Sequence, residues 1–273
     1  MKPIKPIFTI VTVTYNCEDL IKNTLESIIN QDFDDYEYII IDGNSTDNTL
    51  NIIKSYKYKF DDKITIISEN DNGIYDAMNK GMKLAKGELI CFMNSGDTFF
   101  SGALKYIKKF YIENPEYDIY YGDTNNVKII DENTFNKVNY AEKDNKDVIK
   151  KKMLFCHQSS FIKRILINDI GIFNTEYRIA ADWDFFVRCY KNNKKFKYIG
   201  TVVSNFLMGG TSNSNYSKEK HQIRKDNNLV GLIDKYYIAE SIFFLKYFVL
   251  KKLIPVEFYN RIRIRYFQRK MKR

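Results

Sequence analysis

The sequence has few of the residues that build redox centres and metal clusters. Its 273 residues include four cysteines, two histidines and one tryptophan. The cysteines are far apart and form no CxxC pair, so the pattern predicts neither a disulfide framework nor a cysteine-ligated zinc site. They are Cys17, Cys91, Cys156 and Cys189. We expect thiols that act as small hydrophobic side chains in a reducing compartment.

Two common nucleotide-binding signatures are also missing. There is no GxGxxG sequence, which argues against a dinucleotide cofactor, and no GxxxxGK[ST] sequence, which excludes a P-loop. Any bound diphosphate must therefore be neutralised by other groups.

Long hydrophobic runs are absent as well. Residues 242–250 are rich in Phe and Leu, but Glu240, Lys246 and Lys251 break the run, well short of the ~20 apolar residues that a membrane-spanning helix needs. Residues 1–8 lack the apolar centre of a signal peptide. We therefore expect a cytoplasmic protein that does not cross a membrane.

Positive charge is concentrated at the C-terminus. The net charge is +9, yet residues 261–273 hold seven Lys or Arg and no acid, which leaves +2 for the rest. The body is therefore not expected to bind nucleic acid. The tail suits peripheral contact with an anionic membrane, at about 1 kcal/mol per basic residue, so we place the protein at the inner face of the cell membrane. A solvated basic helix packed against the body is the alternative.

The residues that are present predict an α/β fold. Hydrophobic residues make up 44% of the chain, which is ample for a core. Apolar strands alternate with helical patterns, which is typical of a mostly parallel sheet with helices on both faces. The expected strands are residues 7–13, 38–41, 64–67 and 89–93, and the expected helices are 20–30, 49–56 and 75–85.

After Asp97 the pattern becomes less regular. It predicts helices at residues 103–111 and 181–191, and strands at 118–121, 126–130 and 196–203. A further strand begins at His157. The charged residues 131–152 show little periodicity and are interpreted as a loop.

Polar residues follow each of the first four expected strands. In an open α/β sheet the carboxyl ends of the strands form the ligand crevice, so these turns should meet at one site. Helix capping is the better explanation of any one turn alone, but four such turns at one edge of the sheet favour a ligand. The turns are Thr14-Tyr15-Asn16, Asp42-Gly43-Asn44-Ser45, Asn70-Asp71-Asn72-Gly73 and Asn94-Ser95-Gly96-Asp97.

Two of these acids suggest a nucleotide and a metal ion. Asp42 ends the second strand, where a carboxylate accepts hydrogen bonds from a ribose or base. Asp97 follows an apolar strand and a flexible turn, and suits Mg²⁺ or Mn²⁺ shared with phosphate oxygens. A helix N-terminus stabilises an exposed anion by only about 0.3–1 kcal/mol, whereas a divalent ion contributes several kcal/mol of charge stabilisation. The alternative role for Asp97 is a helix N-cap.

These motifs, with residues 72–81 and Ala181-Asp182-Trp183-Asp184, resemble the family 2 inverting glycosyltransferases of the bacterial surface-polysaccharide type. The resemblance extends from Phe8 to about Ser212. It implies a GT-A fold, which is a Rossmann-like, mostly parallel sheet with helices on both faces. It also implies an activated donor, usually a UDP-sugar, and a divalent metal. The residues implied for the donor are Thr14, Tyr15, Asp42, Asp71 and Asn94, with Asp97 on the metal.

The same resemblance implies that Asp182 is the catalytic base of an inverting transfer. It lies at the start of the helix expected at residues 181–191, with Asp184 as the competing choice and helix capping as the structural alternative. Trp183 suits either a sugar-stacking or a core position, and Arg188 either a phosphate contact or an ion pair with Asp184.

Two departures from the family pattern concern these acids. Asn94 and Gly96 stand where many relatives carry an aspartate of the metal motif, and Ala181 stands where a glutamate usually precedes the base. Only one carboxylate remains in the metal turn. Metal binding is then either weaker, shared mainly with the diphosphate, or assisted by another group. The two histidines, His157 and His221, are candidates, although a structural role is the preferred interpretation of each.

We expect two parts in the chain. Residues 1–212 form the GT-A domain, with a nucleotide-sugar half at 1–100 and an acceptor half at 101–212, and residues 213–273 form a basic, helical, membrane-proximal segment. The acceptor is expected to be a glycan or lipid-linked glycan. Two alternatives stay open: a sugar nucleotidyltransferase, although residues 11–16 have neither Gly nor Arg, and a non-catalytic nucleotide- or glycan-binding protein.

Overall fold

The computed structural model describes residues 5–130, 133–143, 145–209, 217–230, 234–238 and 241–242. The chain forms two compact units, one of Met1–Asn126 with Val138–Leu207 and one of Val127–Lys137 with Met208–Arg273. The predicted basic tail at residues 261–273, and most of the helical segment predicted from residue 213 onward, lie outside the described residues. The boundary at residue 212 and the division into donor and acceptor halves stay predictions.

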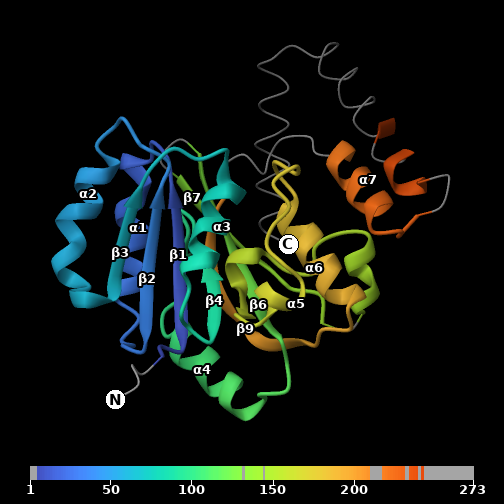
Figure 1. The fold of residues 1–273 in the computed structure, drawn as a ribbon, viewed down its shortest axis with the longest axis horizontal. Helices are drawn as coiled ribbons and strands as arrows, with labels where there is room; N and C mark the ends of the chain where they lie inside the picture. The colour runs from blue at the N-terminus through green and yellow to red at the C-terminus, as the bar shows by residue number, and fades with distance from the viewer. Residues whose placement is uncertain are drawn as a thin grey trace. The chain divides into compact units, whose positions relative to one another are not determined.

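The first unit is built on the sheet that the sequence predicts (Figure 1). Strand β1 (Phe8–Thr14) lies between β2 (Tyr36–Asp42) and β4 (Leu89–Phe92), and β3 (Ile64–Ser68) flanks β2. All three pairings are parallel. Every residue of β1 is buried, because this strand is covered on both faces. The α/β prediction is confirmed.

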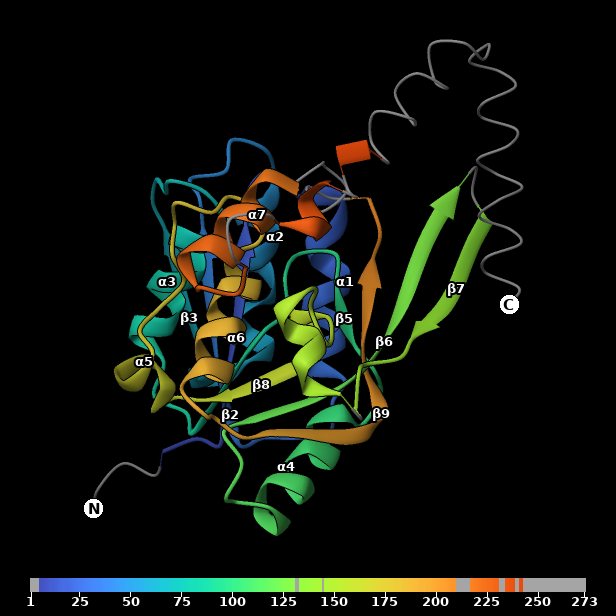
Figure 2. The same cartoon turned by 90° about the vertical axis from the view of Figure 1, so that its right-hand side faces the viewer.

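The remaining strands extend the sheet with reversed directions (Figure 2). Strand β8 (Ser160–Lys163) is antiparallel to β4, and β6 (Ile119–Ile130) is antiparallel to β8. Strand β5 (Thr98–Phe99) pairs antiparallel with β9 (Phe196–Leu207). The parallel part is therefore the half of the sheet formed by the first four predicted strands.

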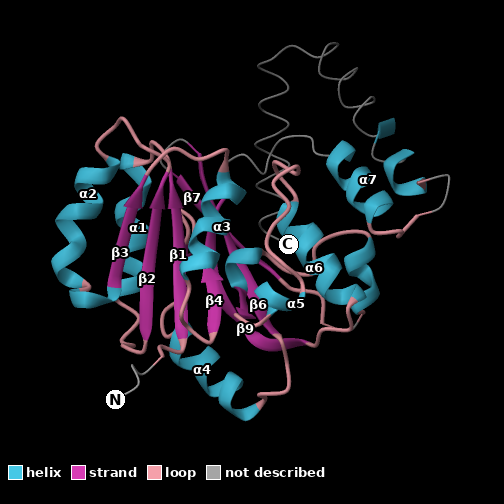
Figure 3. Ribbon diagram, in the orientation of Figure 1, coloured by secondary structure: helices cyan, strands magenta, loops and turns pink. Residues whose placement is uncertain are grey.

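Helices cover both faces of the parallel strands (Figure 3). One face packs against α1 (Glu18–Ile29), α2 (Thr49–Tyr56) and α4 (Ala103–Glu113), whose Leu25, Ile53 and Leu104 share one core with Phe8 and Ile10 of β1. The opposite face of β1 meets α3 (Ile74–Leu84), where Gly81 lies against Val11. Alternate side chains of β1 thus enter two separate hydrophobic layers.

The later helices of the first unit are short. They are α5 (Leu166–Asp169) and α6 (Ala181–Lys191), and the latter has the predicted bounds. Four 3-10 turns complete the regular structure. They are η1 (Lys57–Lys59), η2 (Asp61–Lys63), η3 (Lys146–Lys150) and η4 (His157–Ser159).

The interpretation of residues 131–152 as a loop is wrong in part. Strand β7 (Asn133–Asn139) pairs with β6, and η3 carries the fully buried Ile149. A polar strand that is held by backbone pairing has no hydrophobic alternation, so the sequence gives no period-2 signal for it. The two strands expected at 118–121 and 126–130 are likewise one continuous strand, β6.

The second unit contains α7 (Ser217–Asp226). The Arg224 guanidinium is buried and donates through Nε to Asp234 (2.7 Å), and His221 Nδ1 lies 2.9 Å from the same carboxylate. The His221 ring stacks on Tyr237. This histidine is therefore a structural residue of the second unit. No helix within the described ranges is both long and apolar enough to cross a membrane.

The close contact between α3 and β1 generates a stability prediction. A Cβ on Gly81 would lie 2.4 Å from Val11 Cγ1, and overpacking costs about 1–3 kcal/mol, whereas replacing a helical glycine by alanine gains about 1 kcal/mol. We expect Gly81→Ala to lower the free energy of unfolding in the wild type and to raise it in a Val11→Ala background. Urea denaturation of the four proteins measures this reversal. A loss of stability in both backgrounds would contradict it.

Candidate active site

The four polar turns lie at one edge of the parallel strands, as the sequence predicts. Thr14 is in register with Asp42, and Asp42 with Ser68, so the ends of β1, β2 and β3 are level. The turn after β4 joins them, because Met93 donates from its amide to Val11 O (2.9 Å). The predicted site residues form two clusters along this edge.

Asp42 is the centre of the first cluster. Its carboxylate is fully buried and accepts hydrogen bonds from Thr14 Oγ1 (3.0 Å), from the amide of Ser45 (3.0 Å), from Ser45 Oγ and from Ser68 Oγ (2.7 Å). A carboxylate offers about four such positions, so the protein itself occupies all of them. Asp42 joins the ends of three strands, and its predicted contact with a nucleotide requires one hydroxyl to turn away.

Further hydrogen bonds fix the loops after β1 and β2 to each other. Asn16, which has a positive φ of 45°, accepts from the amide of Thr46 at 2.8 Å. The amide of Cys17 donates to Thr49 Oγ1 (2.8 Å), and Glu18 accepts from the amide of Asn48 (2.8 Å). The loop that carries Tyr15 is consequently fixed to the loop after β2 by side chains from both loops.

Tyr15 and Asp71 both lie close to Gly43. Tyr15 is 64% exposed, and a Cβ on Gly43 would lie 3.4 Å from its ring and 2.5 Å from Asp71 Oδ2. Asp71 is oriented by the amide of Gly73, which donates to its other oxygen (2.8 Å). An exposed aromatic ring beside an oriented carboxylate suits a planar base and its ribose. The roles of Thr14, Tyr15 and Asp71 toward a nucleotide stay predictions.

Asp97 belongs to the second cluster and is almost completely buried, at 4% exposure. Gln158 Nε2 donates to its Oδ2 (2.8 Å), and the amide of Leu207 donates to its Oδ1 (2.9 Å). Burial nevertheless dominates and raises the pKa of Asp97 to about 6, because removal from water disfavours the charged form. The fold therefore holds a carboxylate that is costly to ionise, which is common at functional sites.

The oxygens of the β4 turn fit a hard cation. Asp97 supplies a carboxylate, and Oδ1 of Asn94 is buried with no hydrogen-bond partner among the described residues. An unpartnered buried oxygen is costly unless something binds it. The described residues contain no group of three His, Cys, Asp or Glu that would hold a metal alone. The donor set thus suits an ion whose other ligands are phosphate oxygens and water.

Asp182 is the second residue of α6 and contacts two other segments, α3 and η4. Its Oδ1 accepts from the amide of Trp183 (2.8 Å) and lies 3.1 Å from the Tyr75 hydroxyl, which also donates to Ile179 O (2.8 Å). Its Oδ2 lies 3.2 Å from His157 Nδ1, and the side chains of Asp182 and His157 are each 16% exposed. Asp182 is therefore oriented by the fold yet open to solvent.

Consecutive residues of η4 connect the two predicted catalytic acids. His157 contacts Asp182, and Gln158 contacts Asp97. Asn94 also belongs here, because its Nδ2 lies 3.3 Å from His157 Nε2. The structure therefore brings Asn94, Asp97 and Asp182 into one cluster, although they are far apart in the sequence.

Three residues of this cluster were not among the predicted site residues. Tyr75 was visible only as part of the motif at residues 72–81, His157 was interpreted mainly as structural, and Gln158 was taken as part of a strand. Their partners lie 25 to 107 residues away, so no local pattern reports the contacts. The only sequence signal was that His157 and Gln158 are polar residues next to an apolar strand.

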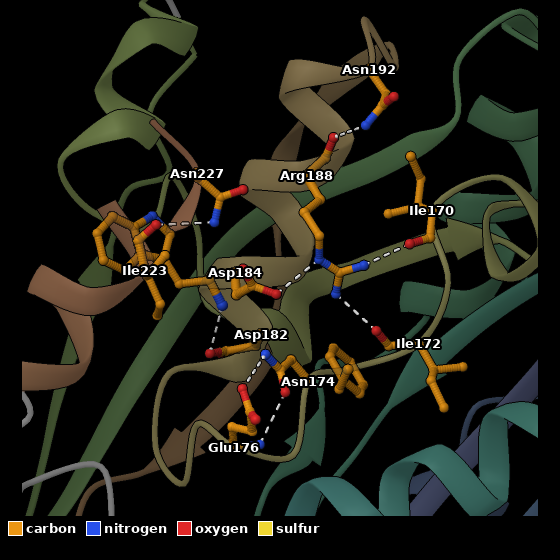
Figure 4. A network of polar contacts seen from close by, with 12 residues as sticks. Ile170, Ile172, Asn174, Glu176, Asp182, Asp184, Arg188, Asn192, Ile223 and Asn227 are labelled. Atoms are coloured by element: carbon orange, nitrogen blue, oxygen red, sulfur yellow. Dashed lines mark hydrogen bonds and ion pairs between the residues drawn. The ribbon is translucent and has the colours of Figure 1, made fainter. Parts of the chain in front are cut away.

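The structure assigns structural contacts to three other residues of α6, namely Trp183, Asp184 and Arg188. Asp184 is buried and accepts from Arg188 Nε (2.8 Å), while the other guanidinium nitrogens of Arg188 donate to Ile170 O (2.6 Å) and Ile172 O (2.8 Å) (Figure 4). Asp184 is thus engaged in an ion pair, and Arg188 is held by the protein. Trp183 is a core residue whose Nε1 donates to Ile149 O (2.7 Å).

The fold and this polar edge define a glycosyltransferase of the GT-A type. The model of the family described as "Glycosyl transferase family 2" matches residues 9–170. A "PGL/p-HBAD biosynthesis glycosyltransferase" of Mycobacterium tuberculosis is 33% identical over 217 residues, which cover 78% of this chain and 82% of the relative. The chain belongs to glycosyltransferase family 2.

Other known proteins agree with this assignment. A "Poly(ribitol-phosphate) beta-glucosyltransferase" of Bacillus spizizenii is 32% identical over 194 residues, or 68% of this chain and 30% of that protein. Among solved structures, S. aureus TarS 1-349 with UDP-GlcNAc superposes with a TM-score of 0.65 at 22% identity and covers 84% of this chain and 68% of its own. The mannosyltransferase PcManGT of Pyrobaculum calidifontis, solved with GDP-Man and Mn²⁺, gives 0.56 at 20% identity, with 88% and 65% covered. The predicted fold is confirmed.

The raised pKa of Asp97 predicts a pH-dependent stability. The unfolded carboxyl loses its proton near pH 4, whereas the folded one retains it to about pH 6, so the free energy of unfolding should fall as the pH rises through this window. Between pH 4 and pH 7 in metal-free buffer we expect the wild type to lose up to about 3 kcal/mol of unfolding free energy relative to Asp97→Asn, whose amide does not titrate. Denaturation at several pH values measures this effect. A stability gap that does not change with pH would contradict it.

Proposed function

We propose that the protein is an inverting glycosyltransferase that moves a sugar from a nucleoside diphosphate donor, most simply a UDP-sugar, to a hydroxyl of a glycan or lipid-linked glycan. The observation that carries the proposal is the η4 connection. His157 and Gln158 join a solvent-accessible carboxylate, Asp182, to a buried one, Asp97. An inverting transfer needs a base for the acceptor and an anchor for the departing diphosphate in one site.

The first cluster would bind the nucleoside. Tyr15 supplies an exposed ring for the base, and Asp71 supplies an oriented carboxylate for the ribose hydroxyls. Thr14 and Asp42 complete this cluster beneath them. The solved TarS complex contains UDP-GlcNAc, which supports a uridine nucleotide as the first ligand to test.

The second cluster would hold the diphosphate end of the donor. Asp97 and the free oxygen of Asn94 would hold a Mg²⁺ or Mn²⁺ ion that is shared with the phosphates. When bound, such an ion neutralises the negative charge that develops on the leaving diphosphate. The Mn²⁺ in the PcManGT complex supports this choice of cofactor.

Asp182 would act as the general base. Its Oδ1 is occupied by the amide of Trp183, so Oδ2 is the oxygen that would take the proton of the acceptor hydroxyl. The acceptor oxygen forms a bond to the anomeric carbon as the bond from that carbon to the phosphate oxygen breaks. The nucleoside diphosphate leaves on the opposite face, and the configuration inverts.

The acceptor is proposed from the relatives. One is named for PGL/p-HBAD biosynthesis and another for glucosylation of poly(ribitol-phosphate), which supports a role in bacterial surface-glycan assembly. The proposed site of action is the inner face of the cell membrane, with the basic residues 261–273 as the contact to anionic lipid. Family membership argues against the sugar nucleotidyltransferase alternative, and the experiments below separate catalysis from simple binding.

The donor site predicts a metal-dependent nucleotide signal. We expect UDP with Mn²⁺ to raise the melting temperature, because a ligand at one hundred times its Kd stabilises the folded state by about 2.7 kcal/mol. The shift should be smaller without Mn²⁺ and largely lost in Asp97→Asn. Thermal shift with UDP, GDP, CDP and dTDP provides the test. The donor assignment would be abandoned if no diphosphate gave a metal-dependent shift.

If Asp182 is the base, its substitution should impair sugar transfer without impairing nucleotide binding. We expect Asp182→Asn to lower kcat by roughly 10²–10⁴-fold while the UDP shift is retained. Asp184→Asn is the matched control: it breaks the Arg188 ion pair and should lower the free energy of unfolding by about 1–3 kcal/mol, with little change in the kcat of the folded enzyme. Normal transfer by a folded Asp182→Asn protein would show that another residue is the base, whereas a wild type that binds UDP but transfers no sugar would favour a binding protein.

A further inference from the structure

His157 has a neighbour on each of its ring nitrogens. Nε2 lies 3.3 Å from the amide nitrogen of Asn94, and Nδ1 lies 3.2 Å from Oδ2 of Asp182. The ring is half-buried, and its side chain is as little exposed as that of Asp182. Its orientation is therefore determined at both ends, by β4 on one side and α6 on the other.

Both neighbours require the same distribution of protons. An amide NH₂ group only donates, so Nε2 must accept and carry no hydrogen. An ionised carboxylate only accepts, so Nδ1 must carry the hydrogen and donate it to Asp182. The two contacts independently place the proton of the neutral imidazole on Nδ1.

The contact with His157 falls on the reactive oxygen of Asp182. Oδ1 is engaged by the Trp183 amide and lies beside the Tyr75 hydroxyl, whereas His157 is the one partner of Oδ2 among the described residues. A single N–H donor leaves one lone pair of Oδ2 available. The carboxylate is thereby prevented from rotating while the oxygen that would receive the proton stays accessible.

We propose that His157 is a positioning residue for the transfer reaction: its Nδ1–H, fixed by Asn94 on Nε2, holds Asp182 Oδ2 in line with the acceptor hydroxyl. This inference depends on the proposed function, since it assigns a partner to the proposed base. It also links the donor turn to the base, because Asn94 belongs to the turn that contains Asp97. A histidine interpreted from the sequence as structural thus gains a specific role in the reaction.

Two substitutions of His157, by Asn and by Gln, distinguish the roles of its two ring nitrogens. The amide nitrogen of an asparagine lies close to the position of Nδ1 and retains the donor to Asp182, whereas that of a glutamine lies close to Nε2 and does not. We expect His157→Asn to keep kcat within about fivefold of the wild type, and His157→Gln and His157→Ala to lose about 10–100-fold. KM for the donor should change little in all three variants, and circular dichroism and melting temperature establish that each is folded.

The proton position is open to direct observation. The chain contains two histidines, so ¹⁵N-histidine labelling gives four ring-nitrogen signals, and those missing in His157→Asn belong to His157. At about pH 8 we expect the Nδ1 signal of His157 to be that of a protonated nitrogen and its Nε2 signal to be that of a bare one. A bare Nδ1 would overturn the proposal.

The kinetic outcomes distinguish this inference from the proposed function. If Asp182→Asn abolishes transfer while the Asn, Gln and Ala variants at position 157 all behave like the wild type, the base stands and the role of His157 is refuted. Equal losses in the Asn and Gln variants would also refute it, because a general packing defect does not discriminate between the two nitrogens. If Asp182→Asn itself is fully active, the assignment of Asp182 as the base fails first, and the role of His157 fails with it.

Discussion

Burying a carboxylate requires hydrogen-bond donors, and this requirement organises the functional edge of the sheet. Asp42 has four donors and no exposed surface, and it joins the ends of three strands. Asp97 has two donors, and burial raises its pKa. Asp182 is oriented on both oxygens but reaches solvent. The same side chain thus has three different roles: Asp42 is structural, Asp97 is a proposed ion ligand and Asp182 is a proposed base.

Much of this architecture was predictable because its signals are local. Apolar strands with polar ends gave β1 to β4 and the edge at which the acids gather, and α6 has the predicted bounds. The contacts of Asp182 with Tyr75 and His157 were not predictable, because they join segments that pack together only in the folded chain. Strand β7 was missed because its polar residues, held by backbone pairing, carry no hydrophobic period. Local periodicity identified the elements, whereas the partners of each acid are a property of the tertiary structure.

The β4 turn carries one carboxylate, Asp97, and one neutral amide, Asn94. The amide nitrogen of Asn94 lies toward His157, and its oxygen is buried with no hydrogen-bond partner among the described residues. An aspartate at this position would have no hydrogen to give to Nε2, so the histidine would have to carry a second proton. The neutral amide of Asn94 can therefore donate from its nitrogen to His157 while its oxygen stays available for the proposed ion.

The contact at Gly81 has a consequence beyond packing. Helix α3 lies so close to β1 there that a methyl group does not fit, and Tyr75, six residues earlier on the same helix, reaches Asp182. Six residues span ~9 Å of α-helix, so the helix acts as a rigid spacer between the middle of the sheet and the carboxylate. Any change that lifts this helix from the sheet would move the tyrosine with it. A substitution at Gly81, which lies inside the hydrophobic core, would then change the position of the Tyr75 side chain at the functional edge of the sheet.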